Sequence, residues 1–251
     1  MLNIIACDPI VGLPRVPLPG GLRPDVADLL AEMDRLGISR SVVRHRAALD
    51  GGPEAAWYVS REDLAGNDRL IPALPLTPDG REPDWDVSLA LGQALREGAR
   101  LAWADPVTWG FSLQPWCCGP LYRVLTERRV PLLVEYGKTS ANELEVILSA
   151  FPDLRLILLG APREGRNRLL YPLLERHPNL WLCLSNLYSV HRGFEDLVRN
   201  FGPDRWVFGT NYPVSEGGAA LAGLMYADLT PAARGALAAG NLERLLGEVV
   251  L

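Results

Sequence analysis

The chain has 251 residues, 48% of them hydrophobic, and a formal net charge of −5. This length and composition are enough for a large hydrophobic core, and no apolar run is long enough to span a membrane. The positive charges are scattered arginines that form no basic stretch, which argues against nucleic-acid binding. We therefore expect neither a membrane nor a nucleic acid as partner.

Residues 1–7 contain no basic region, so they do not have the pattern of a secretory signal. The four cysteines include no Cys-x-x-Cys pair, which gives no indication of a zinc knuckle or a disulfide framework. Free cysteines usually pack as small apolar groups in reducing compartments. The sequence therefore predicts reduced thiols and a cytoplasmic location.

Short apolar runs alternate with amphipathic segments from one end of the chain to the other. Nearly continuous apolar runs are typical of strands buried on both faces. These predicted strands are residues 3–7, 41–45, 70–74, 99–103, 130–135, 154–159, 180–184 and 206–209. The predicted helices are residues 26–36, 54–65, 86–97, 121–128, 141–150, 166–175, 194–200, 219–226, 231–239 and 242–246.

Eight strands that alternate with helices indicate a parallel sheet, and at this length a closed (β/α)8 TIM barrel is the natural arrangement. We expect a single domain over residues 1–251. A doubly wound open sheet is the alternative, but it would normally have a glycine-rich phosphate loop after an early strand, and residues 8–14 are not one. The proline-rich residues 13–24 are interpreted as a long first βα loop.

Two segments near the C-terminus are the most informative. The first reads Gly202-Pro203-Asp204-Arg205-Trp206-Val207-Phe208-Gly209-Thr210-Asn211-Tyr212-Pro213, and the second reads Gly240-Asn241-Leu242-Glu243-Arg244-Leu245-Leu246-Gly247. They resemble the last strand and terminal helix of the amidohydrolase-related (amidohydrolase 2) family of metal-dependent hydrolases and decarboxylases. Residues 29–43, 67–72 and 151–158 resemble, in order, its first helix and second strand, the start of its third strand and its sixth strand.

The resemblance implies a site for divalent metal at the C-terminal ends of the strands. The family pattern has His-x-His after the first strand, His after the fifth and sixth, and Asp after the eighth. In this chain those positions hold Asp8 and Ile10, then Glu135, Gly160 and Asn211. The sequence thus predicts a divergent member with a degenerate metal site and no expected cofactor. An alternative stays open, in which oxygen atoms of three of these residues bind magnesium or manganese.

Polar residues at the strand ends are the catalytic candidates, because active sites of such barrels lie there. Asp8 and Glu135 could act as acid and base, or could pair with arginines near the end of the second strand. Asn211 has no ionisable carboxylate and is expected to orient a ligand by hydrogen bonds. His45 is a candidate general base, unless the alternation of the strand turns it toward the helices.

Five further residues are predicted to bind substrate: Arg44, Trp103, Trp109, Lys138 and His191. The two tryptophans, together with Trp116, could form the wall of an apolar ligand pocket, a packed lid or a contact in a homo-oligomer. Lys138, the sole lysine, could anchor an anionic ligand. The third histidine, His177, is expected on the far side of the barrel as a solvated residue.

Three functional interpretations follow. In the first, the barrel has lost the usual metal ligands but keeps a small-molecule site, either for binding or for metal-independent hydrolase or lyase chemistry. In the second, the chain is an active metal-dependent hydrolase or decarboxylase with an oxygen-ligand site at Asp8, Glu135 and Asn211. In the third, the chain is a catalytically inactive structural or interaction protein. The substrate cannot be named from the sequence.

Overall fold

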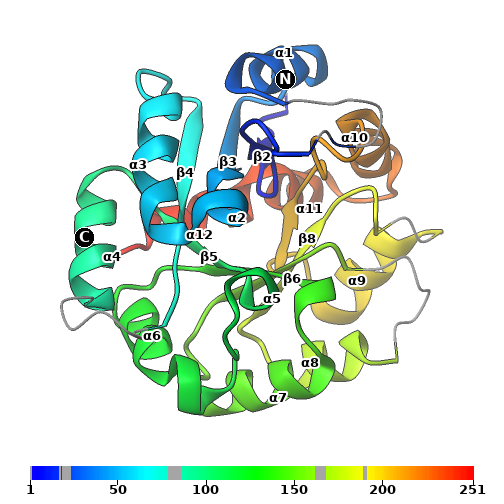
Figure 1. Cartoon of the computed structure of the whole chain (residues 1–251). Coiled ribbons are helices and arrows are strands. Elements are labelled where there is room, and N and C mark those ends of the chain that lie inside the picture. The colour runs from blue at the N-terminus through cyan, green and yellow to red at the C-terminus, as the bar shows by residue number, and fades with distance from the viewer. Residues whose placement is uncertain (1, 17, 19–23, 79–85, 162–167, 189–190) are drawn as a thin grey trace.

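The computed structural model describes residues 2–16, 18, 24–78, 86–161, 168–188 and 191–251. Within them, eight parallel strands follow one another in the order β1-β3-β4-β5-β6-β7-β8-β9, and the short β2 pairs with β3. The Cys7 N–H donates to the Phe208 carbonyl (2.9 Å) and so links the first strand to the last. The predicted TIM barrel is therefore confirmed, as a parallel barrel that is nearly closed (Figure 1).

The strands are short and almost wholly buried. Their bounds are β1 Ile5–Ala6, β2 Ile10–Val11, β3 Arg40–His45, β4 Leu70–Pro75, β5 Leu101–Ala104, β6 Leu132–Glu135, β7 Leu156–Leu159, β8 Leu180–Leu184 and β9 Trp206–Phe208. Side chains alternate between the barrel interior and the layer under the helices. On β3, for example, Val42 packs in the interior and Val43 packs in the outer layer.

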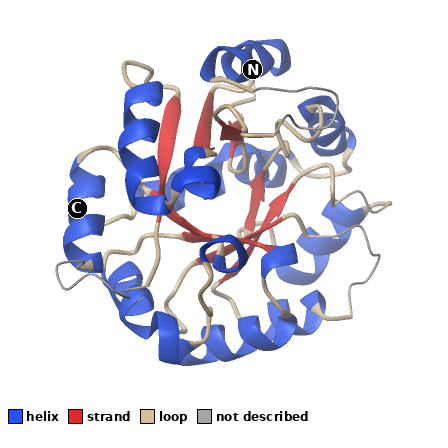
Figure 2. Ribbon diagram, in the orientation of Figure 1, coloured by secondary structure: helices blue, strands red, loops and turns tan. Residues whose placement is uncertain are grey.

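The helices form a ring around the strands (Figure 2). Those of the βα repeat are α1 Val26–Leu36, α3 Pro53–Leu64, α4 Val87–Arg96, α6 Pro115–Glu127, α7 Ala141–Ala150, α8 Leu170–Arg176, α9 Gly193–Phe201 and α10 Gly217–Tyr226. No helix in the described ranges combines the length and the apolar character that crossing a bilayer requires.

The N-terminal end of the barrel is covered by the last part of the chain. Helix α11 (Pro231–Gly235) continues through a π-helical turn, η3 (Ala236–Gly240), into α12 (Asn241–Gly247). Three leucines of α12 pack with Val207 and Trp181 in the interior cluster. The Asn241 amide donates to the carbonyls of Pro203 (2.7 Å) and Trp206 (2.8 Å), which ties α12 to β9.

Short elements that the periodicity did not predict lie at the C-terminal end. They are β2, α2 (Ala47–Gly51), α5 (Pro106–Trp109) and the 3₁₀ turn η2 (Tyr136–Lys138). Helices α2 and α5 lie in front of the strand ends in the view of Figure 1. They narrow the opening of the barrel at the end where a site was expected.

Most predicted boundaries agree with the structure to within two residues, and three segments coincide with it: residues 26–36, 141–150 and 180–184. The largest difference is α6, which begins at Pro115 rather than at residue 121. Proline is well tolerated in a first helical turn, and Gln114 before it is extended. Parts of two predictions, residues 17 and 19–23 of the long loop and 166–167 of a helix, lie outside the described residues.

Candidate functional site

Arg44 crosses the interior of the barrel at its C-terminal end. Its side chain is 9% exposed and arises from β3, on the face that Val42 also occupies. Nη1 donates to Glu135 Oε1 on β6 (2.6 Å), and Nη2 donates to the carbonyl oxygen of Asp8 after β1 (3.0 Å). One guanidinium therefore connects three strand ends. The alternative in which a predicted carboxylate pairs with an arginine is the one that the structure contains.

Asp8 and Asn211 meet through the backbone rather than through the Asn side chain. The Asp8 carboxylate accepts the N–H groups of Thr210 (2.7 Å) and Asn211 (2.8 Å), one on each oxygen. Asn211 has a left-handed backbone with φ 58°, a conformation that Asn tolerates better than most residues. Burial raises the pKa of Asp8, and the two N–H bonds and the Arg44 charge oppose this only in part.

Because Gly209 has no side chain, the Cys183 thiol and the Asp8 carboxylate can both lie close to its backbone. A Cβ at this position would lie 2.4 Å from Cys183 Sγ and 2.6 Å from Asp8 Oδ2. The Cys183 thiol hydrogen-bonds to Cys7, and burial raises its pKa well above the ordinary value. At neutral pH the Cys183 thiol is thus a protonated packing group beside Asp8.

Trp103 and Trp109 lie against each other at the mouth of the barrel. Their rings meet edge to face at 5.0 Å, and the Arg44 guanidinium lies 5.5 Å from the Trp103 ring centre. Trp109 Nε1 donates to the Ala48 carbonyl (2.8 Å) and so links α5 to α2. Arg44 Nε and Trp103 Nε1 are buried and have no hydrogen-bond partner among the described residues.

Lys138 lies beside this cluster. Its ammonium is 3.3 Å from Asp105 Oδ2, and the other oxygen of Asp105 caps α5 by accepting the Thr108 N–H. Asp105 follows β5 directly, so it occupies a strand end like the other acidic residues. Sequence reasoning missed it, although its place before Pro106 is a recognisable helix start.

His45 lies outside the cluster because the next residue along β3 faces the other way. Its Nε2 is 2.9 Å from Asp63 Oδ2 of α3, and its Nδ1 accepts the Ala47 N–H (3.2 Å). Trp116 is also apart from the other two tryptophans, since it lies on α6 with 80% of its surface exposed. His177 lies between α8 and β8 on the far side of the barrel, as expected, but it is buried rather than solvated, and Nε2 contacts Glu145 Oε2 at 2.5 Å.

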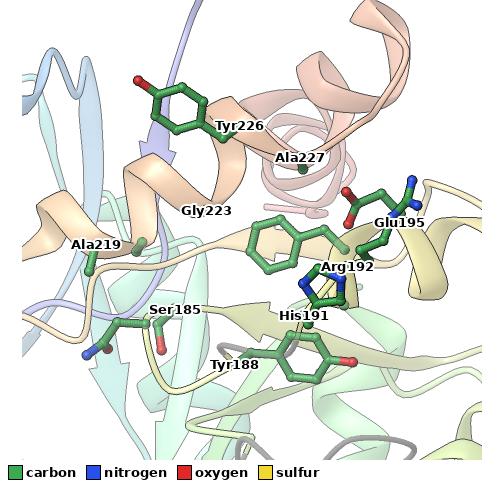
Figure 3. Close-up of a pocket in the computed structure, with 13 residues that line it drawn as sticks. Ser185, Tyr188, His191, Arg192, Glu195, Ala219, Gly223, Tyr226 and Ala227 are labelled. Carbon is green, nitrogen blue, oxygen red and sulfur yellow. The ribbon is translucent and has the colours of Figure 1, made fainter.

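His191 lines a different hollow, between β8, α9 and α10 (Figure 3). This cavity measures about 520 Å³. Arg44, Glu135 and the two clustered tryptophans are not among its lining residues. The predicted residues therefore divide into three places: the barrel mouth around Arg44, the contact of His45 with α3, and the cavity beside His191.

The two carboxylates that the sequence predicted at the mouth, Asp8 and Glu135, already have hydrogen-bond partners. In the part of the chain that the structure describes, no group of three or more His, Cys, Asp or Glu side chains is placed to hold one ion. Asp8 uses both carboxylate oxygens on backbone N–H groups, and Glu135 uses one on Arg44. The chemistry that these groups can support is anion recognition by Arg44 and proton transfer by the partly exposed Glu135.

Comparison with solved structures shows the same fold in several proteins. An uncharacterized TIM-barrel protein from Bordetella bronchiseptica is 20% identical, with a TM-score of 0.73 over 98% of this chain and 99% of that one. 2,6-Dihydroxybenzoate decarboxylase from Rhizobium is 16% identical, with a TM-score of 0.72 and coverage of 98% and 99%. 5-Carboxyvanillate decarboxylase from Sphingomonas paucimobilis is 14% identical, with a TM-score of 0.71 and the same coverage.

At these identities the similarity shows the fold alone. No curated protein sequence matches the chain significantly. The model of the amidohydrolase family described as "Amidohydrolase" matches residues 13–248, which is most of the sequence. This match agrees with the resemblance of the last strand and the terminal helix, and the chain belongs to the amidohydrolase family.

Proposed function

We propose that the protein binds a small carboxylate-bearing molecule at the C-terminal mouth of the barrel and does so without a metal ion. The observation that carries this proposal is the buried Arg44, which contacts both Asp8 and Glu135. A fixed positive charge lies between two of the positions where the family would place metal ligands. This charge attracts anions in the way that a bound cation would.

The donor set does not fit a divalent ion. Hard ions such as magnesium and manganese bind oxygen ligands, usually including one or two carboxylates that are free to coordinate. Here both oxygens of Asp8 accept backbone N–H groups, and a guanidinium is hydrogen-bonded to Glu135. An ion between these residues would face the repulsion of Arg44 and would have to replace existing bonds. A dihydroxybenzoic acid decarboxylase of this fold has bound manganese, but that is a property of that protein.

The unpaired N–H groups of Arg44 and Trp103 support a ligand with acceptor oxygens. Buried donors normally have a partner, and a carboxylate can accept from both types of group. The rings of Trp103 and Trp109 favour a planar ligand. A 2,6-dihydroxybenzoate decarboxylase of the same fold is complexed with 2,6-dihydroxybenzoate, which is one such molecule.

Access to these donors requires movement at the mouth, because both atoms are shielded from solvent. Trp109 is the first candidate to move, since a single hydrogen bond to Ala48 holds its indole N–H. Displacement of the ring would expose the Trp103 ring that it contacts and, next to that ring, the Arg44 guanidinium. Binding is thereby coupled to a rearrangement of α5 relative to α2.

A metal-independent hydrolase or lyase is the second candidate, and Glu135 is the observation that favours it. Its side chain is 43% exposed while one oxygen is held by Arg44. A carboxylate in this position can exchange a proton with a bound ligand and with solvent. Asp8 is less suited to this role because its oxygens hold the turn after β9.

The test is titration calorimetry with 2,6-dihydroxybenzoate before and after treatment with a chelator. We expect saturable binding that survives chelation. Arg44→Gln should weaken it about tenfold or more, as expected for the loss of charge-assisted hydrogen bonds. Arg40→Gln, at the exposed start of the same strand, is the matched control and should leave the affinity unchanged.

Glu135→Gln keeps the size of the side chain and removes its charge. It should change ligand affinity or any turnover while altering the unfolding free energy little, because the group is partly exposed. Stoichiometric divalent metal together with binding that is lost on chelation would establish the metal-dependent alternative instead. Failure of the wild-type protein to bind any aromatic carboxylate would favour a structural role.

A further inference from the structure

The cavity beside His191 is separate from the mouth, and we infer that it is a second binding site, for a small aromatic acid. It lies between the end of β8, the start of α9 and one face of α10. Figure 3 shows Ala219, Gly223, Tyr226 and Ala227 on the α10 side and Ser185, Tyr188, His191 and Arg192 opposite them. A volume of about 520 Å³ is within the range of pockets that bind small molecules.

One side of the cavity is suited to a flat apolar ring. Ala220 and Gly223 present little side-chain bulk, which leaves the space open along α10. Phe194 and Tyr188 stack with their ring centres 6.3 Å apart and their planes at 18°. Tyr226, at the end of α10, also lines the cavity, and 91% of its surface is exposed.

The other side is suited to an anionic group. Arg192 and His191 lie together just before the first turn of α9, and Arg192 takes a left-handed backbone with φ 54°. No side chain caps this nine-residue helix. The N–H groups at a helix start carry partial positive charge and favour anions. β8 and β9 are the seventh and eighth strands of the barrel path, and TIM barrels frequently bind phosphate in the loops after these strands.

Two acidic groups near the cavity are already engaged. Glu195 Oε1 accepts the Asp228 N–H (2.9 Å), and the Asp228 carboxylate is 3.4 Å from Arg192 Nη2. This ion pair is largely exposed on both sides, so it contributes little stability. A ligand carboxylate can therefore replace Asp228 as the partner of Arg192. The negative charge of Glu195, which also lines the cavity, repels anions and so lowers their affinity.

The experiment measures binding of 2-naphthoate by titration calorimetry, with 2-naphthamide as the uncharged analogue. Gly223→Leu should remove the binding event at this cavity for both compounds and leave any binding at the mouth in place, because the new side chain fills the cavity from an exposed helical position. Ala222→Leu, on the next and equally exposed residue outside the lining, is the matched control and should bind like the wild type. Both changes replace small residues with a good helix former, so the fold should persist.

Charge is tested by a second pair of variants. Arg192→Gln should weaken 2-naphthoate about tenfold or more and leave 2-naphthamide unchanged, whereas Arg199→Gln on the exposed part of α9 should affect neither. Glu195→Gln should tighten 2-naphthoate. Unchanged affinity in Gly223→Leu, or no saturable binding to the wild type, would overturn the inference. Loss of 2-naphthoate binding only in Arg44→Gln would assign the ligand to the mouth and equally overturn it.

Discussion

Gly209 shows how the absence of a side chain allows close packing at the mouth of the barrel. Gly209→Ala would insert a carbon between Cys183 and the Asp8 carboxylate, at distances that real Cβ atoms do not adopt. We expect a loss of about 1–3 kcal/mol in the free energy of unfolding, since overpacking a tight site forces backbone shifts. Urea denaturation measures it.

Gly235→Ala is the control for this change, because nothing lies within 4 Å of a Cβ there and the residue ends α11 in helical geometry. It should be neutral or stabilising by about 0.5–1 kcal/mol. Equal stability of the two variants would show that the space around Gly209 opens without penalty.

Asp8 should make stability depend on pH in a direction opposite to that of a salt-bridged carboxylate. Its pKa in the folded protein is raised above the ordinary 3.8 because it is buried. The contribution of protonated Asp8 to the free energy of unfolding is therefore fully present below the ordinary pKa, and it is lost as the pH rises through the raised pKa of the folded protein. The unfolding free energy of the wild type minus that of Asp8→Asn should fall over this interval. Parallel pH profiles of the two proteins would contradict the expected protonation.

For single residues, the sequence predicted where they lie in the fold but not which groups they contact. Strand ends and the family resemblance were enough to place Asp8, Glu135 and Asn211 on the same end of the barrel. The direction of a side chain depends on the pleat, and one step along β3 separates Arg44 in the interior from His45 against α3. The Asn211 contribution through its backbone N–H depends on a left-handed turn that residue types alone do not determine.

Among the elements, three arginines that immediately precede strands donate to carbonyls in the segments that lead into strands. Arg100 donates to carbonyls just before its own strand β5, whereas Arg69 before β4 donates to the turn before the neighbouring β3. Arg205 before β9 likewise donates to the end of α8, before the neighbouring β8. Most of these carbonyls lie in turns outside the helices, where no helical N–H group is available to them. An arginine directly before a strand thus stabilises a neighbouring turn in three of the βα units.

Arg205→Lys tests this function. Arg205 Nη1 donates to the carbonyls of Leu174 (2.9 Å) and His177 (3.0 Å), and the planar group also lies over Phe201 and Trp206. Lysine lacks the planar fork, so we expect a loss of about 1–2 kcal/mol in thermal or urea unfolding. Arg199→Lys, which is two-thirds exposed, should cause no measurable loss. A similar loss in both variants would show that the effect does not come from the specific contacts of Arg205.

Long periodic elements were predicted well, whereas short ones were missed for a physical reason. The apolar strands and amphipathic helices bury enough surface for their pattern to be visible in the sequence. Helices α2 and α5 have five and four residues and are held by tertiary contacts such as the bond from Trp109 to Ala48. Such contacts join positions far apart in the chain, so local periodicity does not report them.

For the whole molecule, the closure of the N-terminal end by α12 should set the cooperativity of folding. Asn241→Ala removes two hydrogen bonds and leaves the Pro203 and Trp206 carbonyls without their donor. We expect a loss of about 2–4 kcal/mol with an unchanged denaturant dependence, because the same surface is exposed on unfolding. Asn200→Ala, which breaks one exposed bond to Asp196, is the control and should have little effect. A second unfolding transition in Asn241→Ala would show instead that α12 detaches on its own.

The overall architecture could be predicted from the sequence because it follows from the number and order of apolar segments. Eight short buried strands with helices between them leave few arrangements at 251 residues. The chemistry of the mouth could not be predicted in the same way. It depends on Arg44 reaching across the interior from β3 to β6, a contact between residues 91 positions apart.

Lys138 is the sole lysine, and it lies at the mouth with 28% of its side chain exposed, next to Asp105. Apart from the chain terminus, the protein therefore offers amine-directed reagents a single position. A fluorophore attached there would stand within reach of the strand ends without any engineered residue. The label would sense local changes when Trp109 moves, and its yield of attachment would itself report whether the ion pair with Asp105 is open.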